Sequence, residues 1–149
     1  MFGKILVAVD GSQPALDALE SALNIAGKCD SIEVQFVHVI QNISSIVYTG
    51  GPELEPFPIG ALKDNLEKSG KMILKDAQKK AKEKKEKVKI STKLLRGNPA
   101  NEIVKLAKDG KFDLIVIGSR GLSGVKELIL GSVSSKVVNS ATVPVLVIK

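Results

Sequence analysis

Short apolar runs alternate with stretches of helical periodicity along this chain, and this alternation restricts the fold more than any other feature. The first run, Ile5–Val9, is apolar at every position, so both alternating sets of side chains in a strand would be buried. A strand covered on both faces is typical of a parallel sheet, because crossover connections place helices over both sides. The sequence therefore predicts an α/β fold.

Five segments carry the strand pattern and four carry helical stripes. The strands are predicted at Phe2–Asp10, Ile32–Ile40, Val88–Leu95, Asp113–Ile117 and Val143–Ile148. The stripes consist of Leu16, Leu19, Leu23 and Ala26, then Leu62, Leu66, Ile73, Ala77 and Ala81, then Ile103, Leu106 and Ala107, and finally Val133, Val137 and Val138 within Ser132–Ser140. Helix starts are indicated by Ser12–Pro14 and Asn98–Pro99, and helix ends by Gly27 and Gly110. This order predicts one domain over residues 1–149, a doubly wound five-stranded parallel sheet with helices on both faces.

The predicted topology places a ligand site before any motif is considered. In doubly wound sheets, ligands bind in the crevice beyond the carboxyl ends of the strands, where the winding direction reverses. Asp10, Val39–Ile40 and Gly118 end the first, second and fourth predicted strands. With the strand order 3-2-1-4-5 these residues would converge, so we expect the site there.

Composition narrows the location and the chemistry of the protein. Charged residues make up 26% of the chain, which is typical of soluble domains, and the first apolar run is too short for a signal sequence or a membrane span. We therefore expect a cytoplasmic protein without a membrane partner. Cys29 and His38 are the sole residues of their types, so an internal disulfide and a zinc cluster are excluded.

The net charge of +6 is concentrated in one segment. Lys63–Lys89 contains eleven lysines and five acidic residues, a difference of +6, so the rest of the chain is balanced. A basic segment can bind nucleic acid, but this one has no arginine and no aromatic residue on which a base could stack. We interpret it as solvated helix surface and expect no nucleic-acid partner.

Between the second predicted strand and the second helix lies an irregular stretch, Gln41–Gly60, with three prolines and three glycines. Loops of this length are often functional. We expect it to serve as a lid or as a partner surface.

The most informative motif begins where the fourth predicted strand ends. Gly118, Gly121 and Gly131 followed by Ser132 have the spacing G-x2-G-x9-G-S, which runs from a strand end to a helix start. Glycine permits close approach of the backbone to an anion, and the free N–H groups of a helix N-terminus bind phosphate oxygens. The same glycines would also suit a plain turn between strand and helix. The spacing alone leaves both interpretations open.

Other nucleotide and catalytic motifs are absent. No G-x4-G-K-[ST] occurs, and no G-x-G-x-x-G follows the first strand, so fast P-loop hydrolysis and dehydrogenase chemistry lose support. His38 lies inside a predicted strand without a second residue on which a catalytic triad could be built, and we interpret it as structural. No catalytic residue and no protein metal site is predicted.

Five blocks that together span the chain resemble the universal stress protein family. They are Ile5–Ser12, Val37–Val39, Asp113–Gly121, Gly131–Val133 and Val143–Val147. The ATP-binding branch of that family carries G-x2-G-x9-G-[ST], and every fixed position of this pattern is present here. The resemblance implies a fold like that of the adenine nucleotide alpha hydrolases and ATP as the ligand, with Mg or Mn carried by the phosphates.

The resemblance also implies roles for individual residues. Asp10 and the backbone of Val39 would face adenine and ribose, and Gly11 is expected among the nucleotide-binding residues. The phosphates would be held by Gly118, Gly121, Gly131, Ser132 and Val133, and Ser119 is counted in this group. Arg120 stands where the family has His or Arg, and its side chain would touch phosphate or point into water. Asp10 has an alternative role, because a carboxylate after a strand commonly caps the following turn or helix.

Two functions in particular compete on this evidence. In the first, the protein is a nucleotide-dependent regulator or switch in the stress response, in which ATP orders the segment Gly118–Ser132 and changes a surface read by an unidentified protein partner. In the second, it is a slow Mg-dependent ATPase or phosphotransfer enzyme. Asp10 is the one candidate base, and the resemblance places it at the wrong end of the nucleotide. We therefore favour the regulator and expect any hydrolysis to be slow.

The last strand predicts a homodimer, as the resemblance also suggests. Val143–Ile148 would be a sheet edge with unpaired backbone groups, which is a liability unless it is covered. Pro144 has no N–H and is tolerated where that side faces outward, so the period of two would turn the N–H groups of Leu146 and Ile148 outward as well. These groups could pair with the same strand of a second copy in a two-fold interface.

Overall fold

The computed structural model of the chain describes residues 2–29, 31–42, 59–84, 87–121 and 130–149. Its elements are β1 (Lys4–Ala8), α1 (Gln13–Ala26), β2 (Glu33–Ile40), α3 (Ile59–Lys84), β3 (Lys89–Arg96), α4 (Pro99–Asp109), β4 (Leu114–Gly118), α5 (Ser132–Ser140) and β5 (Val145–Ile148). The strands pair in parallel in the order β3-β2-β1-β4-β5. The predicted fold and strand order are confirmed.

Local signals in the sequence set most of the element boundaries. Ser12 is the N-cap of α1, and its hydroxyl accepts the N–H of Ala15 at 3.3 Å. Asn98 caps α4 in the same way, accepting the N–H of Asn101 at 3.2 Å. Of the stretch predicted to be irregular, residues 43–58 lie outside the described residues, and Ile59–Gly60 already belong to α3.

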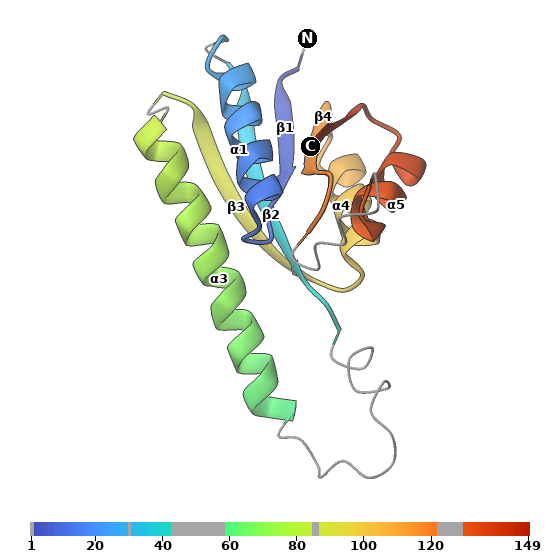
Figure 1. The fold of residues 1–149 in the computed structure, drawn as a ribbon. Helices are drawn as coiled ribbons and strands as arrows, with labels where there is room; N and C mark the ends of the chain where they lie inside the picture. The colour runs from blue at the N-terminus through green and yellow to red at the C-terminus, as the bar shows by residue number, and fades with distance from the viewer. Residues whose placement is uncertain (1, 30, 43–58, 85–86, 122–129) are drawn as a thin grey trace.

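The sheet is covered on both faces by helices (Figure 1). Ile5 and Val7 of β1 pack with α1 and α3 in one buried cluster, whereas Leu6 packs with α4 and α5 in the other. All three side chains are fully buried. The uninterrupted apolar run that predicted a parallel sheet is therefore explained by this two-sided burial.

The central strand β1 and its neighbour β4 are joined at their amino ends by a carboxylate. Asp113 accepts the backbone N–H groups of Lys4 at 2.9 Å and Gly3 at 2.8 Å. These two bonds favour the charged form and hold the pKa of the Asp113 carboxyl below its usual range. The contact aligns the strands that carry the centre of the core.

Helix α3 packs by one side, but the predicted stripe is only partly confirmed. Ala77 and Ala81 are buried together with Gly70 and Leu74, which the stripe did not include, whereas Leu62, Leu66 and Ile73 are half-buried. The lysines at positions 68, 71, 75, 79 and 82 are exposed. None of the helices in the described residues combines the length and the apolar character that a membrane span requires.

The backbone of β5 faces the opposite way from that predicted. Ile115 donates its N–H to the carbonyl of Pro144 at 3.0 Å, and Ser119 donates to the carbonyl of Ile148 at 2.7 Å. Because alternate residues of a strand face the same neighbour, Leu146 also faces β4. The outward backbone groups therefore belong to Val145 and Val147, and the prediction made from Pro144 is wrong by one residue.

The physical reason lies in where β5 begins. Pro144 precedes the first paired residues, Ile115 and Val145, so its missing N–H would have had no ladder bond to make. A proline in that position can face inward without cost to the sheet.

Candidate functional site

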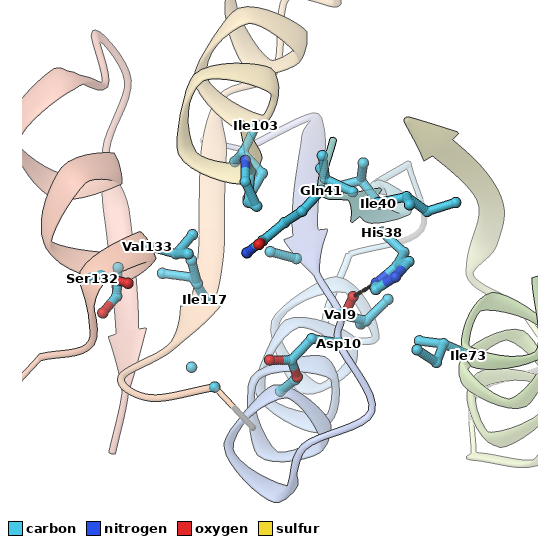
Figure 2. A pocket seen from close by; sticks show the side chains of 18 of the residues that line it. Val9, Asp10, His38, Ile40, Gln41, Ile73, Ile103, Ile117, Ser132 and Val133 are labelled. Carbon is cyan, nitrogen blue, oxygen red and sulfur yellow. Dashed lines mark hydrogen bonds between the residues drawn. The ribbon is translucent and has the colours of Figure 1, made fainter. Parts of the chain in front are cut away.

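A cavity of about 540 Å³ lies at the carboxyl ends of β1, β2 and β4, where the predicted topology places the site. Figure 2 shows it between α5, which contributes Ser132 and Val133, and α3, which contributes Ile73. Much of the lining is apolar, and its polar side chains are Asp10, His38, Gln41, Ser69, Arg120, Ser132 and Ser134. Such a cavity suits a ligand with an apolar body and a charged end.

The predicted site residues divide into two groups. Those that line the cavity are Asp10, Val39, Gly118, Arg120, Gly121, Ser132 and Val133. Gly11, Ser119 and Gly131 do not line the cavity, but each is the chain neighbour of a residue that does. Residues 122–129, in the middle of the predicted phosphate segment, lie outside the described residues.

The carboxylate of Asp10 has two different surroundings. Its Oδ1 accepts the N–H of Ser12 at 2.9 Å and also the Ser12 hydroxyl, so this oxygen does cap the turn into α1. Its Oδ2 lies 2.8 Å from the position that a Cβ on Gly121 would take. A side chain at Gly121 would therefore displace the carboxylate. Gly11 makes this turn possible, with a φ of +83° that favours glycine.

Gly118 is required by packing. A Cβ at this position would lie 2.7 to 2.8 Å from the backbone and Cβ of Pro14 in the first turn of α1. The end of β4 and the start of α1 are thus in direct contact. Gly118 lines the cavity, but the contact with Pro14 explains by itself why no larger residue fits.

The start of α5 offers backbone donors to the cavity. Gly131 is the N-cap and has no side-chain cap bond, and its own N–H donates to the carbonyl of Ser119 at 2.6 Å. The N–H groups of Ser132, Val133 and Ser134 open the helix and have no backbone acceptor among the described residues. The donors left for a ligand are therefore at the first three residues of α5, whereas Gly131 brings the helix start close to Ser119.

The end of β2 exposes another pair of backbone groups. Pairing between β1 and β2 stops at Ala8 and Val37, with Val9 donating its N–H to the carbonyl of Val37 at 2.9 Å. Val39 faces the same side as Val37, beyond the last bond of that ladder. Neither its N–H nor its carbonyl has a partner among the described residues. A buried residue at the cavity wall thus presents one donor and one acceptor side by side.

Some lining residues could not be assigned from the sequence. Leu66 and Ile73 were predicted as core positions of α3, but both are half-buried and line the cavity. Ser134 is buried, and its hydroxyl donates to the carbonyls of Ser119 at 2.8 Å and Gly131 at 3.0 Å. Nothing in its sequence context distinguishes it from the serines around it. In the part of the chain that the structure describes, no three His, Cys, Asp or Glu side chains gather to hold a metal ion.

A family model described as the universal stress protein family matches residues 1–149. The chain belongs to the universal stress protein family. It is 40% identical to the universal stress protein YxiE of Bacillus subtilis over 151 aligned positions, which cover 100% of both chains.

Solved structures of this family share the architecture. The hypothetical protein MJ0577 of Methanocaldococcus jannaschii superposes with a TM-score of 0.84 at 31% identity, covering 100% of this chain and 96% of that one. A universal stress protein from Archaeoglobus fulgidus, in complex with dAMP, superposes with a TM-score of 0.70 at 26% identity, covering 98% and 97%.

Two glycine variants test the packing role of Gly118. We expect Gly118→Ala to lower the free energy of unfolding by about 1 to 3 kcal/mol, because the new methyl group overlaps the backbone of Pro14. Gly60→Ala is the control, since its Cβ would meet nothing within 4 Å, and it should be neutral or stabilise by up to about 1 kcal/mol. Urea denaturation followed by circular dichroism measures both, and equal stabilities would contradict the packing explanation.

Proposed function

We propose that this universal stress protein binds ATP in the cavity and acts as a nucleotide-dependent regulator, whose altered surface is read by a partner protein. One observation carries the proposal: three features suited to a nucleotide converge on the same cavity. These are the open peptide edge at Val39, the carboxylate of Asp10 and the uncapped start of α5. They lie in the order that base, ribose and phosphates require.

The end of β2 suits adenine. The apolar side chains of Val9, Ile40 and Ile117 line the cavity and can pack on the faces of a base. The Val39 carbonyl would accept from the exocyclic amino group of adenine, and the Val39 N–H would donate to N1. Guanine presents an acceptor where adenine presents that amino group, so the same peptide edge would disfavour it. The dAMP complex of the Archaeoglobus fulgidus relative supports an adenine nucleotide as the ligand class.

The opposite end of the cavity suits phosphate. The N–H groups of Ser132 and Val133 and the dipole of α5 favour an anion at the helix start. Gly121 lines the cavity without a side chain that would displace the Asp10 carboxylate, and Arg120 adds a positive charge to the lining. We propose that Mg or Mn enters with ATP, carried by its phosphates.

The alternative is a slow Mg-dependent ATPase or phosphotransfer enzyme. Turnover needs a group that activates or positions water beside the last phosphate. Of the described residues, Asp10 supplies the carboxylate that lines the cavity, and one of its oxygens is already bonded to Ser12. The proposed orientation places Asp10 at the ribose, so we favour binding over catalysis.

Replacing glycines on the phosphate side tests the binding site. We expect Gly121→Val and Gly131→Val each to weaken ATP binding at least about tenfold, or about 1.4 kcal/mol. The first displaces the Asp10 carboxylate, and the second presses on Ser119 and Arg120, whose atoms lie 3.3 and 3.4 Å from the new Cβ. Gly60→Val, in open space, is the control. Calorimetric titration measures the affinity, and unchanged affinity in both site variants would rule out this placement of the phosphates.

Phosphate release separates the regulator from the enzyme. We expect turnover well below about 1 s⁻¹, the lower end of typical enzyme rates, because among the described residues no base is placed at the proposed phosphate position. A coupled assay with Mg²⁺ and ATP measures the rate in the wild type, Asp10→Asn and Ser132→Ala. Sustained turnover at ordinary enzymatic rates that is lost in these variants would favour the alternative.

We also propose that the protein forms a homodimer through its last strand. β5 is an edge strand, and the outward N–H and carbonyl groups of Val145 and Val147 point away from β4. An unpaired edge of this kind invites another strand. Antiparallel pairing with β5 of a second copy would close these groups in a two-fold interface.

Two proline variants of neighbouring residues test this interface. Val147→Pro removes an outward N–H, so we expect a dimer that dissociates at least about tenfold more readily while the melting temperature of the fold is kept. Leu146→Pro removes an inward N–H and should lower the melting temperature instead. Gel filtration with light scattering gives the oligomeric state. A monomeric wild type, or an undiminished dimer in Val147→Pro, would refute the arrangement.

A further inference from the structure

We propose that His38 is a positioning residue for the base: its ring N–H occupies the carbonyl of Val9 and thereby leaves the N–H of Val39 free for adenine. The inference rests on the proposed function and deepens it. It assigns a role to the single histidine of the chain, which is half-buried in β2.

The geometry of the ladder between β1 and β2 is the first step. In a parallel pair, one residue of a strand makes both of its backbone bonds to the neighbouring strand, and the next such residue lies two positions on. Val37 is such a residue, since its carbonyl accepts the N–H of Val9. A regular continuation would bond the N–H of Val39 to the carbonyl of Val9, and the carbonyl of Val39 to the N–H of Gly11. Neither bond is formed.

The early end of this ladder is specific to one side of β2. On its other side β2 stays paired with β3 as far as Ile40 and Arg96, and Gly97 donates its N–H to the carbonyl of Ile40 at 2.9 Å. The strand itself is therefore regular through Val39. The difference therefore lies in β1, whose backbone does not bond to Val39.

His38 supplies the missing bond to β1. Its Nδ1 lies 2.8 Å from the carbonyl oxygen of Val9, the contact drawn as a dashed line in Figure 2. A carbonyl oxygen can only accept, so Nδ1 carries the hydrogen. Val9 is thereby satisfied without Val39. Two residues after Val9, the positive φ of Gly11 turns the chain into α1, which leaves the carbonyl of Val39 unpaired as well.

Packing from α3 holds the imidazole in this orientation. A Cβ on Gly70 would lie 3.0 Å from Cδ2 of His38 and 2.8 Å from Cδ1 of Leu94. The ring edge therefore rests directly against the backbone of the helix, in space that a larger residue at position 70 would fill. Gly70, buried in the middle of α3, is explained by this contact.

Three substitutions separate the position of the donor from the size of the side chain. His38→Asn places an amide nitrogen where Nδ1 lies, whereas His38→Gln carries its amide one bond further, near the position of Nε2. His38→Phe keeps the ring and removes the donor. In the Gln and Phe variants the Val9 carbonyl is left to the N–H of Val39, which closes the ladder and removes the donor for the base.

Two measurements test the proposal. Calorimetry should give ATP affinities for the wild type and His38→Asn within about threefold of each other, and affinities at least about tenfold weaker for His38→Gln and His38→Phe. Amide exchange of the nucleotide-free protein, followed by nuclear magnetic resonance, should show the Val39 amide exchanging at least about tenfold more slowly in the Gln and Phe variants than in the wild type. The Val37 amide, bonded on the same side of β2, is the internal control.

The outcomes distinguish this inference from the proposed function. Equal ATP affinities in all four proteins, or a Val39 amide whose exchange is the same in all four, would overturn the inference alone. A wild type that binds no ATP would overturn the proposed function, and the inference with it. If His38→Phe fails to fold, the comparison of Asn with Gln still decides the question.

Discussion

The burial of β1 and β4 on both faces is the constraint on which the rest of the molecule depends. Leu6 and Ile115 face one cluster of helices, while Val7 and Val116 face the other, and all four side chains are fully buried. Strands buried in this way must be joined by helical crossovers, since a hairpin would place the next strand antiparallel. α1 and α5 therefore follow β1 and β4 onto opposite faces of the sheet (Figure 1). The cavity lies where these two paths part, so the position of the site is a consequence of the core.

The fold was predictable because each step of it has a local cause. Continuous apolar runs indicate strands that are buried on both faces, and Ser12 and Asn98 mark helix starts through bonds that span only three residues. The orientation of β5 was not predictable from Pro144, because it depends on where pairing with β4 begins. That register is set by contacts with residues far away in the chain, such as the bond from Ile115 to Pro144. The period of two divides the residues of β5 into two alternating sets, but it does not show which set directs its backbone groups toward β4.

The place of the cavity was predictable from the sequence, whereas the part that each lining residue plays was not. Gly118, Gly121 and Ser132 of the glycine spacing line the cavity and Gly131 does not, and the three glycines differ in ways that spacing cannot show. Gly118 is required by its contact with Pro14, and Gly121 by its contact with the carboxylate of Asp10. Gly131 instead contacts Ser119, to whose carbonyl its N–H donates. The unpaired N–H and carbonyl of Val39 could not be derived from the sequence pattern, because they result from a bond between His38 and Val9, 29 positions away. To find unpaired backbone groups, one must know which hydrogen-bond partner each N–H and carbonyl has at the end of every strand.

The phosphate side of the proposed site and the outer strand of the sheet meet at one buried residue. Ser119 is 2% exposed. Its N–H donates to the carbonyl of Ile148 at the end of β5, and its carbonyl accepts both the N–H of Gly131 at 2.6 Å and the hydroxyl of Ser134. Because Ser119 is buried, its N–H would have no water to replace the carbonyl of Ile148 if that bond were broken. The start of α5 and the end of β5 are therefore bonded to the same buried residue. A nucleotide bound at α5 and a second chain paired with β5 would act on the same small set of bonds, which gives the proposed regulator a short physical route between its ligand and its surface.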